Sequence, residues 1–278
     1  MSNLENFFPE RIICLTEEPT ETLYLLGEED RIIGISGFTM RPKRARKEKP
    51  KVAAFTTANI EAIVELQPDL VIGFSDIQAE IASALIAKGV PVWINNHRSV
   101  VGIFNMMVQI GSMVGKTQEA IALVKQYRAD LQELGASNQS KSRKPSVYFE
   151  EWDDPMISGI QWVSELIELA GGIDIFNELK HESLAKDRII ADPAEVVRRN
   201  PDIIIASWCG KKFKKSAMLK RENWHQIKAV KNDHIFEIKS ELILQPGPAA
   251  VTDGVKQIIG FIEQWHGAQE QKEAINTN

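Results

Sequence analysis

One stretch of this chain, residues 59–74, is matched without a gap by a second stretch, residues 192–207. Each copy begins at a helix-capping residue, continues with apolar residues at helical spacing, and ends in a Pro-Asp pair followed by an all-apolar run. A helix followed by a buried strand, repeated in this way, predicts two similar α/β lobes. Ligands of such lobes usually bind outside the carboxyl ends of the strands, so we expect the functional site between the two halves.

Strand and helix patterns alternate along the 278 residues, which predicts an α/β fold with mostly parallel sheets. We expect an N-terminal α/β lobe over residues 1–98, connecting helices over 99–135, and a C-terminal α/β lobe over 136–278. The connection includes a long backbone helix at 116–134, whose continuity predicts little hinge closure. Residues 135–145 are expected to form a polar turn, and the tail after Gly267 to be frayed.

Composition excludes several classes of protein. No apolar run approaches the roughly 18 residues that a membrane-spanning helix needs. The net charge of −5 argues against nucleic-acid binding, and the basic segment 41–51 contains no aromatic residue; we expect it to be a solvated loop, with a site for an anionic partner as the alternative. The amino terminus lacks the features of a secretory signal, which predicts a cytoplasmic protein, or a periplasmic one if a signal was removed.

Aromatic residues recur where the predicted strands end. Any one of them could belong to a core, but their shared placement indicates a cleft lined by rings, which suits a large, flat, partly apolar ligand. The residues in this group are Phe38, Phe55, Phe74, Trp152, Trp162 and Trp208.

Charged and nucleophilic residues near these strand ends give a weaker signal. The acidic segment 150–154 surrounds Trp152 and includes Glu151; it could supply acid/base groups, cation ligands or hydrogen-bond acceptors, or be a solvated turn. His97 follows a strand and is a candidate ligand contact or a surface histidine. The lysines after Cys209 could lower the pKa of its thiol, although we favour a buried structural thiol at this position. No metal-binding cluster and no catalytic motif is present, so we expect neither an enzyme nor a cofactor.

The chain resembles the solute-binding proteins of ATP-driven vitamin B12 and iron-siderophore importers, and most of all their cobalamin-binding branch. Residues 11–16, 52–55, 59–72 and 155–159 carry the resemblance, which runs from about residue 11 to 262. It implies two lobes joined by a long helix. It also implies ligand contacts from aromatic residues at Phe38, Phe55 and Phe74, a further contact at Met156, and polar contacts at Glu241 and Gln245.

The same resemblance implies a transporter permease as partner, docked through one acidic residue of each lobe. Glu61 fits the first position, whereas the second falls on Ala194, with Glu195 one residue away. We therefore predict a protein that holds a cobalamin-like or metal-chelate ligand. The alternative is a cytosolic enzyme or ligand sensor built on the same scaffold, with its chemistry drawn from Glu150, Glu151, Asp153, Cys209 and Lys211.

Overall fold

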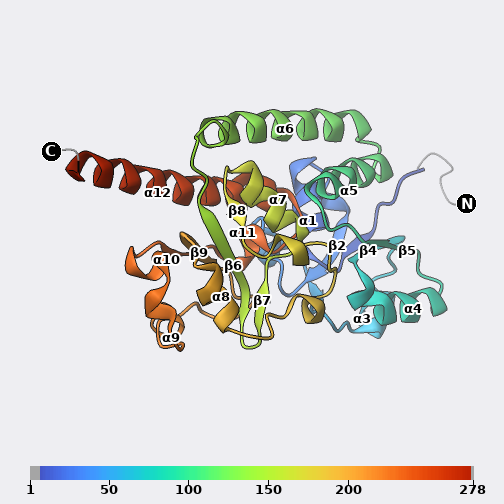
Figure 1. Ribbon diagram of the computed structural model, residues 1–278. Coiled ribbons are helices and arrows are strands. Elements are labelled where there is room, and N and C mark those ends of the chain that lie inside the picture. The colour runs from blue at the N-terminus through green and yellow to red at the C-terminus, as the bar shows by residue number, and fades with distance from the viewer. Residues whose placement is uncertain (1–6, 277–278) are drawn as a thin grey trace, which may run out of the picture. The chain divides into compact units, whose positions relative to one another are not determined.

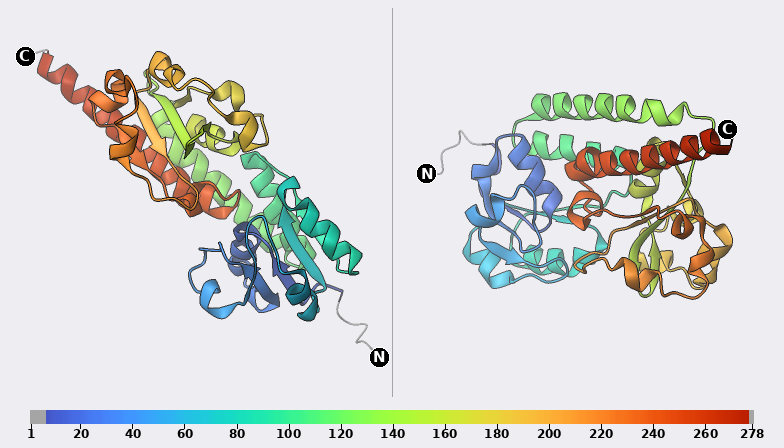
Figure 2. Two further views of the ribbon diagram at one scale, coloured as in Figure 1. Left: turned by 90° about the horizontal axis from the view of Figure 1, so that it is seen from below. Right: turned by 90° about the vertical axis from the view of Figure 1, so that its left-hand side faces the viewer.

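The computed structural model describes residues 7–276 and confirms the α/β class. The chain forms two compact units, each of which combines one sheet with helices (Figures 1 and 2). The first unit contains the chain up to His97 together with Val101–Gln126, and the second contains Arg98–Val100 together with the chain from Tyr127 onward. The segment 99–135, expected as a separate connection, is thus divided between the two units.

The first unit is built on sheet A, whose strands are all parallel and lie in the order β3-β2-β1-β4-β5. Its strands are β1 (Ile12–Cys14), β2 (Ile32–Ser36), β3 (Lys51–Ala53), β4 (Leu70–Phe74) and β5 (Val92–Asn95). Its helices are α1 (Glu17–Leu25), α2 (Ala45–Glu48), α3 (Ile60–Glu65), α4 (Ala79–Ala87) and α5 (Val100–Met113), with short 3-10 turns η1 (Glu29–Arg31) and η2 (Asp76–Gln78). Ile13, Val71 and Leu85 are among the residues that form its core.

The second unit is built on sheet B, in the order β10-β9-β6-β7, with β8 also paired to β6. Only β7 is antiparallel to its neighbour among these strands. The strands are β6 (Ser146–Asp153), β7 (Met156–Ser158), β8 (Ile173–Asp174), β9 (Ile203–Ala206) and β10 (Ile235–Glu237). The helices are α7 (Gln161–Leu169), α8 (Ala194–Arg199), α9 (Lys215–Met218), α10 (Lys228–Lys231), α11 (Ser240–Ile243) and α12 (Val255–Asn276), and α6 (Thr117–Gln139) is shared with the first unit. Shorter turns are η3 (Asn177–Leu179), η4 (Ala185–Arg188), η5 (Trp224–Gln226) and the π-helical η6 (Ala250–Gly254).

The repeated sequence forms the same structure in both units. Asp69 of the first Pro-Asp pair accepts hydrogen bonds from the backbone N–H groups of Glu10 and Arg11, at the start of β1. Asp202 of the second pair accepts from the N–H and hydroxyl of Ser146, at the start of β6. In each case the aspartate joins the beginnings of two neighbouring parallel strands. The Pro-Asp pair therefore stops a helix and also sets the alignment of the two strands beside it.

Three boundaries differ from the sequence prediction. The segment 150–154 is the end of β6 and the start of a hairpin to β7 rather than a loop. Glu150 pairs with Ser158 of β7 in the antiparallel ladder, and its side chain is buried. Helix α6 continues to Gln139 through the expected turn. Helix α12 continues to Asn276, where the tail was expected to fray, and Lys141 and Arg143 form ion pairs with its residues Glu270 and Glu273.

The basic segment 41–51 also has more structure than the predicted loop. It contains α2 and leads into β3, which is an edge strand of sheet A. Ala45 is fully buried, and Arg44 forms an ion pair with Glu29. Charges facing solvent on an edge strand hide the strand pattern from sequence reasoning.

Candidate functional site

Four predicted ligand residues lie along one edge of sheet A. Because the strands are parallel, their carboxyl ends share an edge. Phe38 follows β2, Phe55 follows β3, Phe74 ends β4 and His97 follows β5. The side chains of Phe38 and Phe55 are 59% and 36% exposed, whereas Phe74 is 6% exposed and meets the His97 ring edge-on at 5.4 Å between centroids. This edge therefore presents two exposed rings beside a pair formed by the buried Phe74 and the half-buried His97.

Charged side chains hold the backbone that carries Phe38. The Glu17 carboxylate accepts hydrogen bonds from the backbone N–H groups of Met40 and Arg41. From the other side, Nη1 of Arg46 donates to the carbonyl oxygens of residues 37 and 39, at 2.6 and 2.9 Å. The exposed ring of Phe38 thus projects from a loop whose backbone is fixed at four points.

The first turns of α1 contain three buried acids, Glu17, Glu18 and Glu21. Burial raises the pKa of Glu17 to about 8 and the pKa of Glu18 to about 7, and neighbouring carboxylates add to both shifts. Glu21 is paired with Arg41 at 2.8 Å. Within residues 7–276, no three His, Cys, Asp or Glu side chains are grouped so that they could hold a metal ion. Glu17 and Glu21 instead hold the loop that follows β2, through the backbone of Met40 and Arg41 and the Arg41 side chain.

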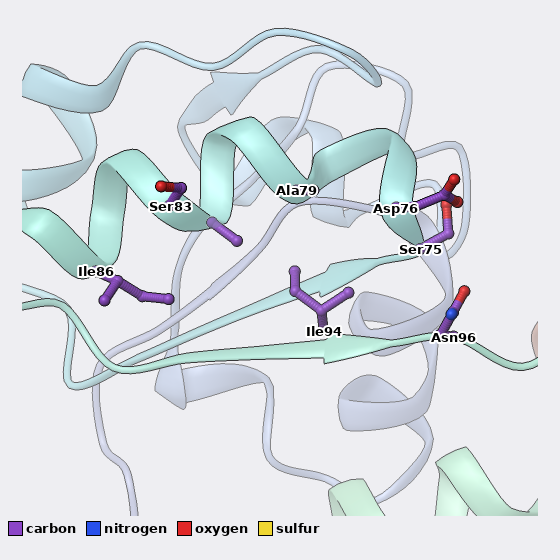
Figure 3. A pocket seen from close by; sticks show the side chains of 8 residues that line it. Ser75, Asp76, Ala79, Ser83, Ile86, Ile94 and Asn96 are labelled. Atoms are coloured by element: carbon purple, nitrogen blue, oxygen red, sulfur yellow. The ribbon is translucent and has the colours of Figure 1, made fainter.

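A shallow hollow of about 530 Å³ lies between α4 and β5 of the first unit (Figure 3). Ile86 and Ile94 form part of its apolar wall, and Ser75, Asp76 and Asn96 lie together at one end. None of the predicted ligand residues lines this hollow.

In the second unit, Trp152 and Trp208 come from the ends of neighbouring strands, β6 and β9. Nζ of Lys211 lies 5.3 Å from the centroid of each ring and 2.7 Å from the carboxylate oxygens of Asp153. Trp152 is partly exposed, whereas Trp208 is buried at 5% exposure. The Lys211 ammonium group therefore makes cation–π contacts with both rings, and Trp152 also packs against the core of the second unit.

The acidic residues of this region are committed to structural contacts. Glu150 is completely buried and accepts hydrogen bonds from the Tyr148 hydroxyl, from Nε1 of Trp208 and from the Arg221 guanidinium, the first two at 3.0 Å. Glu151 forms a two-point ion pair, at 2.6 and 3.1 Å, with Arg188, which is also buried. With Asp153 paired to Lys211 as well, Glu150, Glu151 and Asp153 are all engaged in ion pairs, whereas Asp154 is exposed.

Cys209 is exposed, and its pKa is raised by partial burial of the thiol and by the charges of Glu151 and Glu241. The expectation that the neighbouring lysines lower this pKa is wrong, because desolvation outweighs them, and the favoured interpretation as a buried structural thiol is wrong as well, because the residue lies on the surface. A thiol with a raised pKa is a poorer nucleophile at neutral pH. The reading of this region as an enzyme site has no support in its geometry.

The remaining predicted contacts of the second unit differ in exposure. Trp162 lies in α7 at 3% exposure, and its Nε1 donates to the carbonyl of Ile243 at 2.8 Å. Met156 is 5% exposed and belongs to the core around Tyr148. Glu241 at the start of α11 and Gln245 just after it are partly exposed. Trp162 and Met156 therefore contribute to packing in this structure, and the two polar residues remain available for contacts.

The two predicted docking acids differ in their surroundings. Glu61 in α3 is exposed and forms no ion pair within residues 7–276. Glu195 in α8 pairs with Arg198 and Arg199 on its own helix. Its negative charge is therefore largely compensated, whereas that of Glu61 is open to a partner.

Sequence reasoning missed three residues that organise these strand ends: Gln78, Arg188 and Arg221. Gln78 donates to the carbonyl of Phe55, Arg188 pairs with the half-buried Glu151, and Arg221 pairs with the buried Glu150. Arg221 is separated from Glu150 by 71 residues, so no local pattern connects them. A polar glutamine directly before the apolar stretch of α4 was the one available signal for Gln78.

Comparisons with known proteins agree with this arrangement. The chain is 28% identical over 260 residues to an uncharacterized ABC transporter substrate-binding lipoprotein of Bacillus subtilis (strain 168), covering 90% of this chain and 79% of the relative. It is 27% identical to a vitamin B12-binding protein of Vibrio campbellii, covering 85% of this chain and 84% of the relative. The crystal structure of a possible iron-binding, periplasmic solute-binding protein of Staphylococcus epidermidis matches with a TM-score of 0.77 and 24% identity, covering 91% of this chain and 98% of that one.

No helix within residues 7–276 combines the length and the apolar composition needed to cross a membrane. The model of one family, described as periplasmic binding protein, matches residues 12–242, which include both sheets and every strand end discussed above. Members of such a family bind solutes and are not enzymes. This chain belongs to the periplasmic binding protein family.

Proposed function

We propose that this chain is the solute-binding component of an ABC importer and that its ligand is a cobalamin-like compound or another metal chelate. The observation that carries the proposal is the pair of exposed rings, Phe38 and Phe55, on the carboxyl edge of sheet A. Exposed aromatic faces on a fixed backbone suit a large, flat, partly apolar ligand. The names of relatives that bind vitamin B12 or iron support the same class of ligand.

In this proposal the second unit also contributes contacts to the ligand. Trp152, Glu241 and Gln245 are the candidates, because all three side chains are partly exposed. Trp152 would add a ring, and the other two would supply polar groups that fix the orientation of the ligand. Trp162 and Met156 are buried, so they would support the site by packing and would not contact the ligand directly.

We also propose that the protein works outside the cytoplasm with a transporter permease, as the description of its family and a lipoprotein relative suggest. Glu61 is the candidate docking acid, because its carboxylate is exposed and unpaired within the described residues. Glu195 would dock less well, since two arginines already neutralise it.

Isothermal titration calorimetry tests the ligand class. Purified protein is titrated separately with cyanocobalamin, haemin and a ferric siderophore, ferrioxamine B. We expect one of them to bind, and we expect Phe38→Ala and Phe55→Ala each to weaken that binding by about tenfold, since a lost aromatic contact costs roughly 1–2 kcal/mol.

Phe7→Ala is the matched control, because Phe7 is 85% exposed and precedes β1, away from the carboxyl ends of the strands. It should leave the affinity unchanged. If the protein binds haemin or ferrioxamine B but not cyanocobalamin, the ligand class is an iron chelate and not a cobalamin. If none of the three produces heat at high micromolar concentration, the proposal is wrong.

A further inference from the structure

The side-chain amide of Gln78 joins three separate segments of the first unit. Gln78 is completely buried at the end of η2. Its Oε1 accepts a hydrogen bond from the backbone N–H of Phe74 at 2.9 Å, and its Nε2 donates to the carbonyl of Phe55 at 2.9 Å and to that of Leu15 at 3.4 Å. The amide therefore connects the ends of β1 and β4 with the segment after β3.

The surrounding chain is shaped to admit this amide. A Cβ on Gly73 would lie 2.6 Å from Oε1 of Gln78, so only glycine leaves room for the amide there. Ser75 turns the chain sharply with φ +60° and ψ 176°, a region of backbone conformation that is costly for any residue except glycine. Its N–H donates to the carbonyl of Asn95 at 2.6 Å, which holds the turn against β5. This turn allows the side chain of Gln78 to reach back across the sheet edge.

Phe55 depends on the amide more than the neighbouring strands do. It lies in a turn closed by backbone hydrogen bonds from Ala54 to Thr57 and from Asn59 to Val52. The carbonyl of Phe55 is bonded to Gln78, while its ring is 36% exposed. The strands β1 and β4 also pair through their own ladder. Loss of the amide should therefore release the Phe55 turn and leave the sheet paired.

We propose that Gln78 is a positioning residue that fixes the Phe55 ring for ligand binding. This inference rests on the function proposed above, in which Phe55 contacts the ligand. Glutamine suits the role because a single amide supplies both the acceptor for an N–H and the donor for carbonyl groups. Holding a contact residue in its bound position before the ligand arrives reduces the entropy lost on binding.

A double-mutant cycle tests the inference. Affinity for the ligand identified among cyanocobalamin, haemin and ferrioxamine B is measured for the wild type, Gln78→Met, Phe55→Ala and the double variant. We expect Gln78→Met to weaken binding by about tenfold in the wild-type background, through loss of the hydrogen bond to Phe55. In the Phe55→Ala background it should weaken binding less than twofold, because the ring that it positions is gone.

A purely structural role gives a different result. Phe55→Ala keeps the backbone carbonyl, so a general destabilisation by Gln78→Met would reduce the affinity by the same factor in both backgrounds. Equal factors, or no loss of affinity in either background, overturn the inference while the proposed function stands. Failure of the wild type to bind any of the three probes overturns both. Gln109→Met, the same substitution on the exposed surface of α5, is the control and should change neither affinity nor stability.

Gln78→Asn provides a second variant should Gln78→Met not fold. Asparagine keeps an amide but is one methylene shorter, so it cannot reach both Phe74 and Phe55. We expect the same dependence on the Phe55 ring, together with faster amide hydrogen exchange in residues 53–58 than in β1 and β4. Exchange that rises equally in the turn and in the strands would contradict selective positioning of Phe55.

Discussion

Replacement of Glu17 by Gln should stabilise the first unit at alkaline pH. Glu17 is 2% exposed, and burial raises its pKa from 4.5 to about 8, with further increases from the charges of Glu21 and Glu18. A carboxyl whose pKa is raised by folding contributes stability that is complete below about pH 4.5 and is lost as the pH rises through about 8. Each pKa unit corresponds to about 1.4 kcal/mol, so the free energy of unfolding should fall by roughly 5 kcal/mol over this range.

Glutamine is neutral throughout, and its oxygen can accept the same N–H groups of Met40 and Arg41. The wild type and Glu17→Gln should therefore have similar stability at pH 5, and the variant should be more stable by several kcal/mol at pH 9. Guanidinium unfolding at stepped pH, followed by hydrogen exchange in β1 and β4, measures the difference for this unit. Glu18 titrates in both proteins, so the difference between them reports Glu17 together with its coupling to Glu18. Unfolding free energies that run parallel between pH 5 and 9 would refute the assignment of a buried, protonated Glu17. Glu61→Gln, which changes an exposed carboxylate of the same unit, should alter the unfolding free energy by less than about 0.5 kcal/mol.

Two further predictions concern the second unit and the thiols. Glu150→Ala leaves the part-buried Arg221 without its partner and should destabilise the second unit by about 3–5 kcal/mol in chemical unfolding. The control Glu270→Ala, which breaks an exposed pair with Lys141, should cost less than about 1 kcal/mol. Equal losses of stability in the two variants would contradict the structural role of Glu150. A thiol reagent at pH 8 should label Cys209 slowly, because the pKa of this exposed thiol is raised. Cys14 should stay unlabelled until the protein unfolds, because burial raises the pKa of its thiol to about 12. Rapid labelling of both thiols in the native protein would be inconsistent with the structure.

The elements that local sequence patterns specify were predicted well. The repeated helix and strand could be located because their signals lie within a few residues: a capping Asn59 whose side chain accepts from Ala62, an apolar stripe, and a Pro-Asp stop. The pattern also led to the correct edge of sheet A for Phe38 and Phe55, since the carboxyl ends of parallel strands lie together.

Elements set by distant partners were predicted poorly. Gly135 resembled the start of a turn, yet α6 continues through it, because a glycine there lets the helix approach the carbonyl of Leu169, 2.5 Å from where a Cβ would lie. Glu150 resembled a loop acid because its partner Arg221 lies far away in sequence. Burial of a charge or a close helix contact depends on residues that no short window contains.

The division of α6 between the two units has a consequence for any attempt to separate them. The first unit needs α5 and the first part of α6, and α5 supplies the fully buried Ile103, Met107 and Ile110. A fragment that stops at His97 would lose these side chains and expose the apolar surface that they cover. A genetic split at the first crossing between units would thus yield an aggregation-prone half-protein, and a fragment able to fold alone would have to keep residues well beyond that crossing.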